Sequence, residues 1–173
     1  DYLLEGGQMK GWDIEVVTDK QAGRRGLRAT LELGSQTGQG HTDQWLANFA
    51  QSGLSLDQTL RVGDQTVTMR DWVTQSQLDV PRNVIREYSW TLIALSPYIP
   101  SNATWTASDG QTWSIERLVQ IEADQELGSS ACGGTHRLIG LTMALARHRS
   151  ERGELEGGWA KADQVIQQAI ANA

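Results

Sequence analysis

Two sets of segments recur along this chain with a period of about 46 residues, and this internal repeat limits the folds that the sequence can adopt. Trp113 and Trp159 lie 46 residues apart, and each follows a glycine turn and opens an amphipathic run. A second series, which holds Trp45, Trp90 and Leu138, alternates with the first at about the same spacing. Two alternating series at one period indicate a two-helix unit used three times. Such a unit cannot bury its apolar face alone, so it must stack on copies of itself.

The pattern therefore predicts an all-α fold of stacked helical hairpins, forming a partial α/α toroid or a short solenoid. Thr68 and Ser114 are each placed to cap a helix, and Asp71 follows Thr68 at the spacing of a capping box. The sequence between the helices is polar at 57–65 and 101–110, which we interpret as linkers. Apolar residues recur at helical spacing in residues 41–51, 68–78, 84–95, 114–121, 137–149 and 159–173.

The first 25 residues lack the repeat, so we expect an irregular N-terminal segment at 1–25 and an α-hairpin repeat domain at 26–173. Alternation over 12–17 is compatible with a short strand, and residues 27–33 are helix-capable. The last helix ends at Ala173 without the polar capping repeat that closes a solenoid. We therefore expect the chain to be part of a longer parent or to pack on another copy or chain.

The charge of the chain narrows the classes of partner. The formal net charge is −6 and the sequence pI is about 5.0, whereas a duplex-binding surface needs basic clusters, so nucleic acid is not expected. No apolar run approaches the length of a membrane span, and the single Cys132 excludes an internal disulfide framework. The chain starts at Asp1 rather than methionine, as after removal of a signal peptide. An exported bacterial protein is therefore favoured over a cytoplasmic one.

Polar side chains gather where the first helix of each unit begins. If the units stack in register, these starts come to one face of the molecule. We expect convergent polar groups there to form the binding site. The candidate ligand-binding residues are His41, Asp43, Gln44, Glu87, Tyr88, Trp90 and His136.

Three interpretations of these helix starts stay open. His41, Asp43, Cys132 and His136 together could form a tetrahedral set suited to zinc. Alternatively, Asp43, Cys132 and His136 could be catalytic, since a helix N-terminus favours a thiolate and a histidine can act as its base. In the third interpretation, these residues have only structural roles, because they cap helices or pack in the core. We expect no cofactor, with zinc as the one metal for which a candidate set exists. The charged runs 120–126 and 147–154 are read as solvated surface.

Hairpins of this length with tryptophan and glycine at their turns resemble the α/α-toroid proteins: squalene–hopene cyclases, prenyltransferase β-subunits and thioester domains. Segments 40–47 and 131–138 look closer still to uncharacterised bacterial members of that repeat class. The acidic motifs of the cyclases, the thioester glutamine and the prenyltransferase zinc pattern are absent. The resemblance therefore implies a fold of terpenoid cyclase or prenyltransferase type and carries over no catalytic residue.

Two functions from different classes follow from these observations. The first is a non-catalytic repeat module that binds a protein, peptide or glycan, which the absence of a complete catalytic motif favours. The second is a hydrolase or transferase that uses the Asp, Cys and His candidates, with or without zinc.

Overall fold

The computed structural model describes residues 2–7, 13–19, 23–31, 39–83 and 87–172. This part of the chain combines α-helices with short antiparallel β-hairpins, so the predicted all-α toroid or solenoid is wrong. The helices are α1 (Gln44–Gln51), α2 (Met69–Asp79), α3 (Ser89–Leu95), α4 (Ile115–Ala123), α5 (Thr135–Ser150) and α6 (Gly157–Ala171). The strands are β1 (Ile14–Asp19), β2 (Arg24–Ala29), β3 (Thr59–Val62), β4 (Gln65–Thr68), β5 (Thr104–Thr106) and β6 (Thr112–Ser114). Short 3₁₀ segments lie at Val80–Arg82, Leu127–Ser129 and Ala131–Gly134.

The N-terminal segment is not irregular, because β1 and β2 pair as an antiparallel hairpin with Val16 opposite Leu27. The boundary expected at residue 25 falls inside β2, and the helix-capable stretch begins as strand. The hairpin packs on α2 through Gly26, where an added Cβ would lie 2.2 Å from Gln75 Oε1. Arg28 adds a two-point ion pair to Asp79 of α2, with Nε 2.7 Å from Oδ2 and a terminal guanidinium nitrogen 3.0 Å from Oδ1.

Each segment expected to be a polar linker contains the first strand and the turn of a β-hairpin. Leu60 pairs with Val67 across the β3–β4 hairpin, and Trp105 pairs with Trp113 across β5–β6. The turns between these strands pass through Gly63 (φ 57°) and Gly110 (φ 76°), backbone conformations that glycine adopts without strain. Each hairpin leads directly into the next helix, so the recurring unit is a helix, a hairpin and a second helix in the first two units.

Local capping explains where two of these helices begin. Thr68 and Asp71 form the predicted capping box at the start of α2, with the Thr68 hydroxyl 3.2 Å from the Asp71 backbone N–H. Ser114 caps α4 in the expected way, since its hydroxyl accepts the backbone N–H of Arg117 at 2.9 Å. Each hairpin therefore passes into a helix at its last strand residue.

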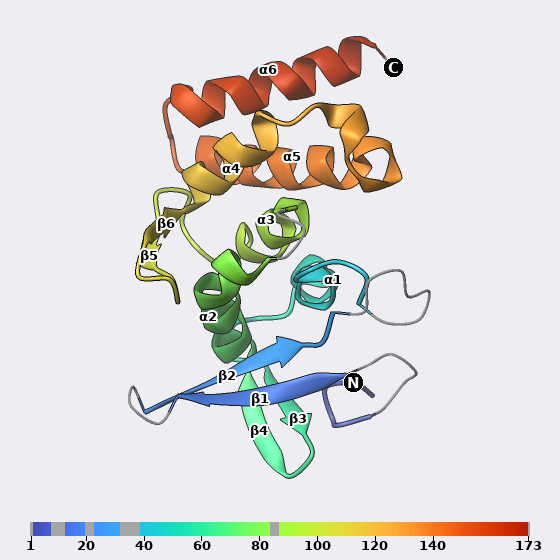
Figure 1. Ribbon diagram of the computed structural model, residues 1–173, viewed down its shortest axis with the longest axis vertical. Coiled ribbons are helices and arrows are strands. Elements are labelled where there is room, and N and C mark those ends of the chain that lie inside the picture. Colours follow the sequence, from blue (N-terminus) through green and yellow to red (C-terminus); the bar gives the residue numbers. More distant parts are fainter. Residues whose placement is uncertain (1, 8–12, 20–22, 32–38, 84–86, 173) are drawn as a thin grey trace.

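The first helices of the three units lie side by side, with α3 between α1 and α5 (Figure 1). Every residue of α3 is buried, which makes this short helix the centre of the core. α5 approaches α3 most closely at Gly140, where an added Cβ would lie 2.7 Å from the Ser89 carbonyl oxygen. α6 packs on α4 and α5 at the end of the molecule farthest from β1 and β2 (Figure 1).

None of the helices in the described ranges combines the length and the apolar character needed to span a bilayer. This agrees with the absence of a membrane span from the sequence expectations.

Candidate functional site

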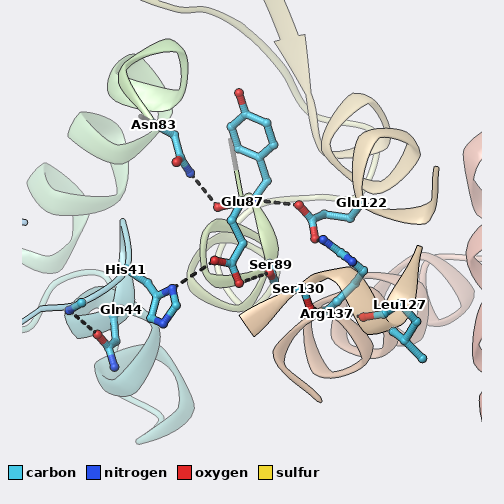
Figure 2. A network of polar contacts seen from close by, with 11 residues as sticks. His41, Gln44, Asn83, Glu87, Ser89, Glu122, Leu127, Ser130 and Arg137 are labelled. Carbon is cyan, nitrogen blue, oxygen red and sulfur yellow. Dashed lines mark hydrogen bonds and ion pairs between the residues drawn. The ribbon is translucent and has the colours of Figure 1, made fainter. Parts of the chain in front are cut away.

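His41 and Glu87 form an ion-pair contact between the segment before α1 and the segment before α3. His41 Nδ1 lies 3.0 Å from Glu87 Oε2, and the two side chains are 21% and 11% exposed (Figure 2). An ionised carboxylate only accepts hydrogen bonds, so Glu87 favours the His41 tautomer that carries its proton on Nδ1 and its lone pair on Nε2. Nε2 makes no hydrogen bond to any residue in the described ranges.

Further hydrogen bonds fix Glu87 in this position. Ser89 Oγ donates to Glu87 Oε1 at 3.2 Å, so both carboxylate oxygens are engaged. The Asn83 side-chain amide donates to the Glu87 backbone carbonyl at 2.6 Å (Figure 2). The carboxylate therefore approaches His41 from a constrained backbone rather than from a free loop.

His136, at the start of α5, joins this pair through ring contacts. The His136 ring centroid lies 4.3 Å from that of Trp90 and 6.0 Å from that of His41, and the His41 and Trp90 centroids are 5.7 Å apart. We call the group His41, Glu87, Ser89, Trp90 and His136 the polar cluster. It brings together residues from the starts of three helices that lie far apart in the sequence.

Two buried nitrogens of the polar cluster lack hydrogen bonds. Trp90 Nε1 and His136 Nδ1 are both shielded from solvent and have no hydrogen-bond partner within the described part of the chain. The indole N–H can only donate, whereas a neutral imidazole offers one donor and one acceptor. An unpaired buried polar group costs about 1–3 kcal/mol, so the folded chain bears a cost here that an external polar group would relieve.

The environment of His136 keeps its imidazole neutral at pH 7. Burial lowers the pKa of His136 below its usual 6.5, the nearby His41 lowers it further, and the charge of Glu87 acts in the opposite direction. A neutral His136 next to a carboxylate-paired His41 gives the site both hydrogen-bond donors and acceptors.

A buried ion pair behind the polar cluster holds its two flanking segments together. Glu122 of α4 is fully buried, and its Oε1 accepts the backbone N–H of Tyr88 at 2.7 Å. Its Oε2 accepts the Arg137 guanidinium Nε at 3.0 Å, and Figure 2 shows Glu122 and Arg137 side by side. Arg137 also donates to the Glu126 carbonyl at 2.7 Å. Tyr88 follows Glu87 in the chain and Arg137 follows His136, so this one carboxylate fixes both neighbours of the cluster.

The turn that carries His41 is fixed by amide side chains. Gln44 Oε1 accepts the Gly40 backbone N–H at 2.8 Å, and Gln39 Oε1 accepts the Trp45 backbone N–H at 3.0 Å. Gln44 thus supports the candidate site through the backbone. Tyr88, also expected to bind ligand, is 5% exposed and packs against Trp113 with ring centroids 5.7 Å apart.

The structure separates Asp43 from the polar cluster. Its Oδ2 accepts the Thr91 hydroxyl at 2.7 Å, and the residue lines a cavity together with Arg28 and Asp79. The Asp43 backbone is left-handed, with φ 63°, so its side chain projects differently from that of an ordinary helix cap. This local conformation was not visible in the sequence.

Cys132 does not join the histidines. It is exposed, and the hydrogen bond at this residue runs from Thr135 Oγ1 to its backbone carbonyl at 3.1 Å. Among the residues that the structure describes, no group of three or more His, Cys, Asp or Glu side chains is arranged to hold a metal ion. The set His41, Asp43, Cys132 and His136 is therefore not assembled as a tetrahedral site.

Three important residues were missed from the sequence. Ser89 was passed over beside Trp90, and Arg137 beside His136. Glu122 lies in a charged run that was interpreted as solvated surface, and for Glu122 this is wrong because the residue is fully buried. The available signal was its place within α4, where Leu118, Val119 and Ala123 are also buried.

Comparisons with protein families, curated proteins and solved structures gave no match to this chain. The resemblance to cyclases and prenyltransferases thus has no support from a family match.

Proposed function

We propose that this chain is a binding domain and that its ligand contacts the polar cluster. The observation that supports this is the pair of buried, unpaired nitrogens, Trp90 Nε1 and His136 Nδ1, on rings 4.3 Å apart. Buried polar groups in proteins are nearly always hydrogen-bonded, so two unpaired groups side by side indicate a site that is completed from outside. The ring of His41, whose Nε2 has no hydrogen bond to a described residue, lies 5.7 Å from the Trp90 ring, centroid to centroid.

The hydrogen-bonding groups favour a neutral ligand. Both oxygens of the Glu87 carboxylate are engaged by His41 and Ser89, and His136 is neutral at pH 7, so a cation finds no open carboxylate oxygen and an anion would lie beside the charge of Glu87. It offers the Trp90 N–H as a donor and the imidazole nitrogens as donor and acceptors. Hydroxyl and amide groups match both kinds of partner, which points to a glycan or a peptide backbone.

A binding comparison with two neutral probes tests this proposal. N-acetylglucosamine carries hydroxyls and an amide, and a blocked dipeptide carries amides alone. Titration followed by NMR should show binding of at least one probe by the native chain, and roughly tenfold weaker binding by E87Q and H136A, since one or two hydrogen bonds are lost. E116Q, at an exposed position on α4, serves as the matched control. Equal affinities for E87Q, H136A and E116Q would contradict the proposal.

One observation favours a second function, general acid–base catalysis as in a hydrolase or transferase. The Glu87 contact sets His41 in the tautomer with a basic Nε2, the arrangement that a base needs. This alternative predicts hydrolysis of an activated ester, such as p-nitrophenyl acetate, at a rate at least about tenfold above that of H41A. Rates equal to those of H41A would leave binding alone as the proposed function.

A further inference from the structure

A second site lies between the N-terminal hairpin and α2, apart from the polar cluster. A cavity of about 320 Å³ is bounded by β2, α2 and the segment before α1, and Trp72, Ser76 and Asp43 are among its lining residues. His41, Glu87 and His136 are not among the residues that line it. Its volume falls at the lower end of the range for small-molecule sites.

The lining of this cavity has more negative than positive groups. Glu15, Asp43 and Asp79 contribute three carboxylates, against the two guanidinium groups of Arg28 and Arg82. Arg28 is already bound, since it pairs with Asp79 through two nitrogens and with Glu15 at 3.3 Å. The excess negative group is therefore Asp43, which forms no ion pair to a described residue.

Asp43 has unused hydrogen-bonding capacity. Thr91 engages Oδ2 at 2.7 Å, which leaves Oδ1 without a comparably close donor in the described part of the chain. Ser76, 4% exposed and also lining the cavity, has a hydroxyl with no hydrogen-bond partner of normal geometry there, although it lies close enough to the Asp43 carboxyl to lower its pKa. A hydroxyl that points its proton toward a carboxylate keeps its own oxygen as an acceptor, so Ser76 and Asp43 together offer two adjacent acceptors.

The backbone at Asp43 carries strain that the fold retains. Its φ of 63° and ψ of 8° are left-handed values that cost a residue with a side chain about 1–2 kcal/mol. Burial also raises the pKa of Asp43 above its usual value, so the folded chain bears a second cost at this residue. Strain and desolvation at one residue that lines a cavity are typical of a ligand site.

We propose that this cavity binds a small primary amine, with the ammonium group against Asp43 and Ser76 and the alkyl chain along Trp72. The ammonium supplies a positive charge next to Asp43 and donors for the remaining lone pairs of Asp43 and Ser76. This site does not depend on the function proposed for the polar cluster, because the two sites have no side chain in common.

Butylamine and butanol at pH 7.5 test the proposal with probes of matched length. NMR titration of the native chain should show roughly ten- to hundredfold tighter binding of butylamine, the contribution of a charge-assisted hydrogen bond. The backbone amides of Asp43, Trp72 and Ser76 should show the largest shifts. D43N should lose the preference for the amine, and D64N, on the exposed β3–β4 turn, should keep it.

Several outcomes would overturn the proposal. These are equal binding of butylamine and butanol, no binding of either probe, native affinity in D43N, or shifts that map away from Ser76 and Trp72. Asparagine tolerates the left-handed conformation, so D43N should fold, and circular dichroism verifies this before the titration. If D43N does not fold, the shift map and the amine-to-alcohol ratio of the native chain decide the question.

Discussion

Glu87 Oε2 lies 3.0 Å from His41 Nδ1, although 46 residues separate them in the sequence. That separation equals the repeat period, so the contact joins equivalent ends of the first and second units. The contact forms because α1 and α3 pack side by side, and α5 on the other side of α3 then adds His136. The polar cluster is a consequence of the packing order of these three helices.

Removal of one partner of the buried ion pair between Glu122 and Arg137 should strongly destabilise the folded chain. E122A leaves a guanidinium that is 6% exposed without its carboxylate, and we expect a loss of about 3–5 kcal/mol in the free energy of unfolding. The double variant with methionine at both positions should lose less than either single alanine variant, since no charge is then left buried. Urea unfolding of E122A, R137A and their double alanine variant closes a double-mutant cycle, and a loss in the double variant equal to the sum of the two single losses would argue against coupling of the pair.

Asp43 should destabilise the folded chain at neutral pH. Because burial raises the pKa of Asp43, the folded state binds more protons than the unfolded state between pH 3.8 and the raised value, so stability falls as the pH rises through that window. D43N removes this dependence and keeps a residue that tolerates the left-handed backbone, so its stability at pH 7 should equal or exceed that of the native chain. D43A should be about 1–2 kcal/mol less stable than D43N, as measured by urea unfolding at several pH values.

Neighbouring charges should move the titration of His136 in opposite directions. H41A removes a group that lowers the pKa of His136, so this pKa should rise, whereas E87Q removes a group that raises it, so it should fall. The lowered pKa also means that stability decreases as the pH falls through 6.5, since the unfolded chain then binds the extra proton. NMR titration of the imidazole protons follows each variant, and a shift in the same direction for both would exclude the proposed arrangement.

Gly140 should be indispensable for the contact between α3 and α5. G140A places a methyl group 2.7 Å from the Ser89 carbonyl oxygen, and we expect a loss of about 1–3 kcal/mol from overpacking. G128A is a matched control, because an added Cβ at Gly128 meets no atom within 4 Å. Thermal unfolding of G140A and G128A measures the difference. Equal melting temperatures would mean that α3 and α5 accommodate the added methyl group without loss of stability.

The helices could be predicted because their signals are local. The caps at Thr68 and Ser114 and the apolar spacing of α2 and α4 are visible in short windows. The β-hairpins could not be predicted from local signals. The strands β5 and β6 have three residues each, and their threonine-rich composition also fits a loop. Their pairing depends on glycine turns and on the helices they lead into.

The sequence predicted which helix starts meet at the candidate site, but not the orientation and pairing of every side chain there. The period correctly placed the starts of α1, α3 and α5 near one another, which is why His41, Glu87 and His136 were candidates. Asp43 diverged because its left-handed backbone turns the side chain toward Thr91. Glu122 was missed because burial of a charge depends on a partner from another helix, Arg137, which no local pattern reveals.

The imidazole nitrogens of His41 and His136 give the most direct test of the polar cluster as a binding site. Long-range ¹H–¹⁵N spectra of the native chain should first show a proton on the Nδ1 of His41, the nitrogen that contacts Glu87. Addition of N-acetylglucosamine or the blocked dipeptide should then shift the ring nitrogens of both histidines and the indole N–H of Trp90 together, along one binding curve. Unchanged imidazole and indole signals at concentrations that shift other parts of the chain would contradict the assignment of the polar cluster as the site.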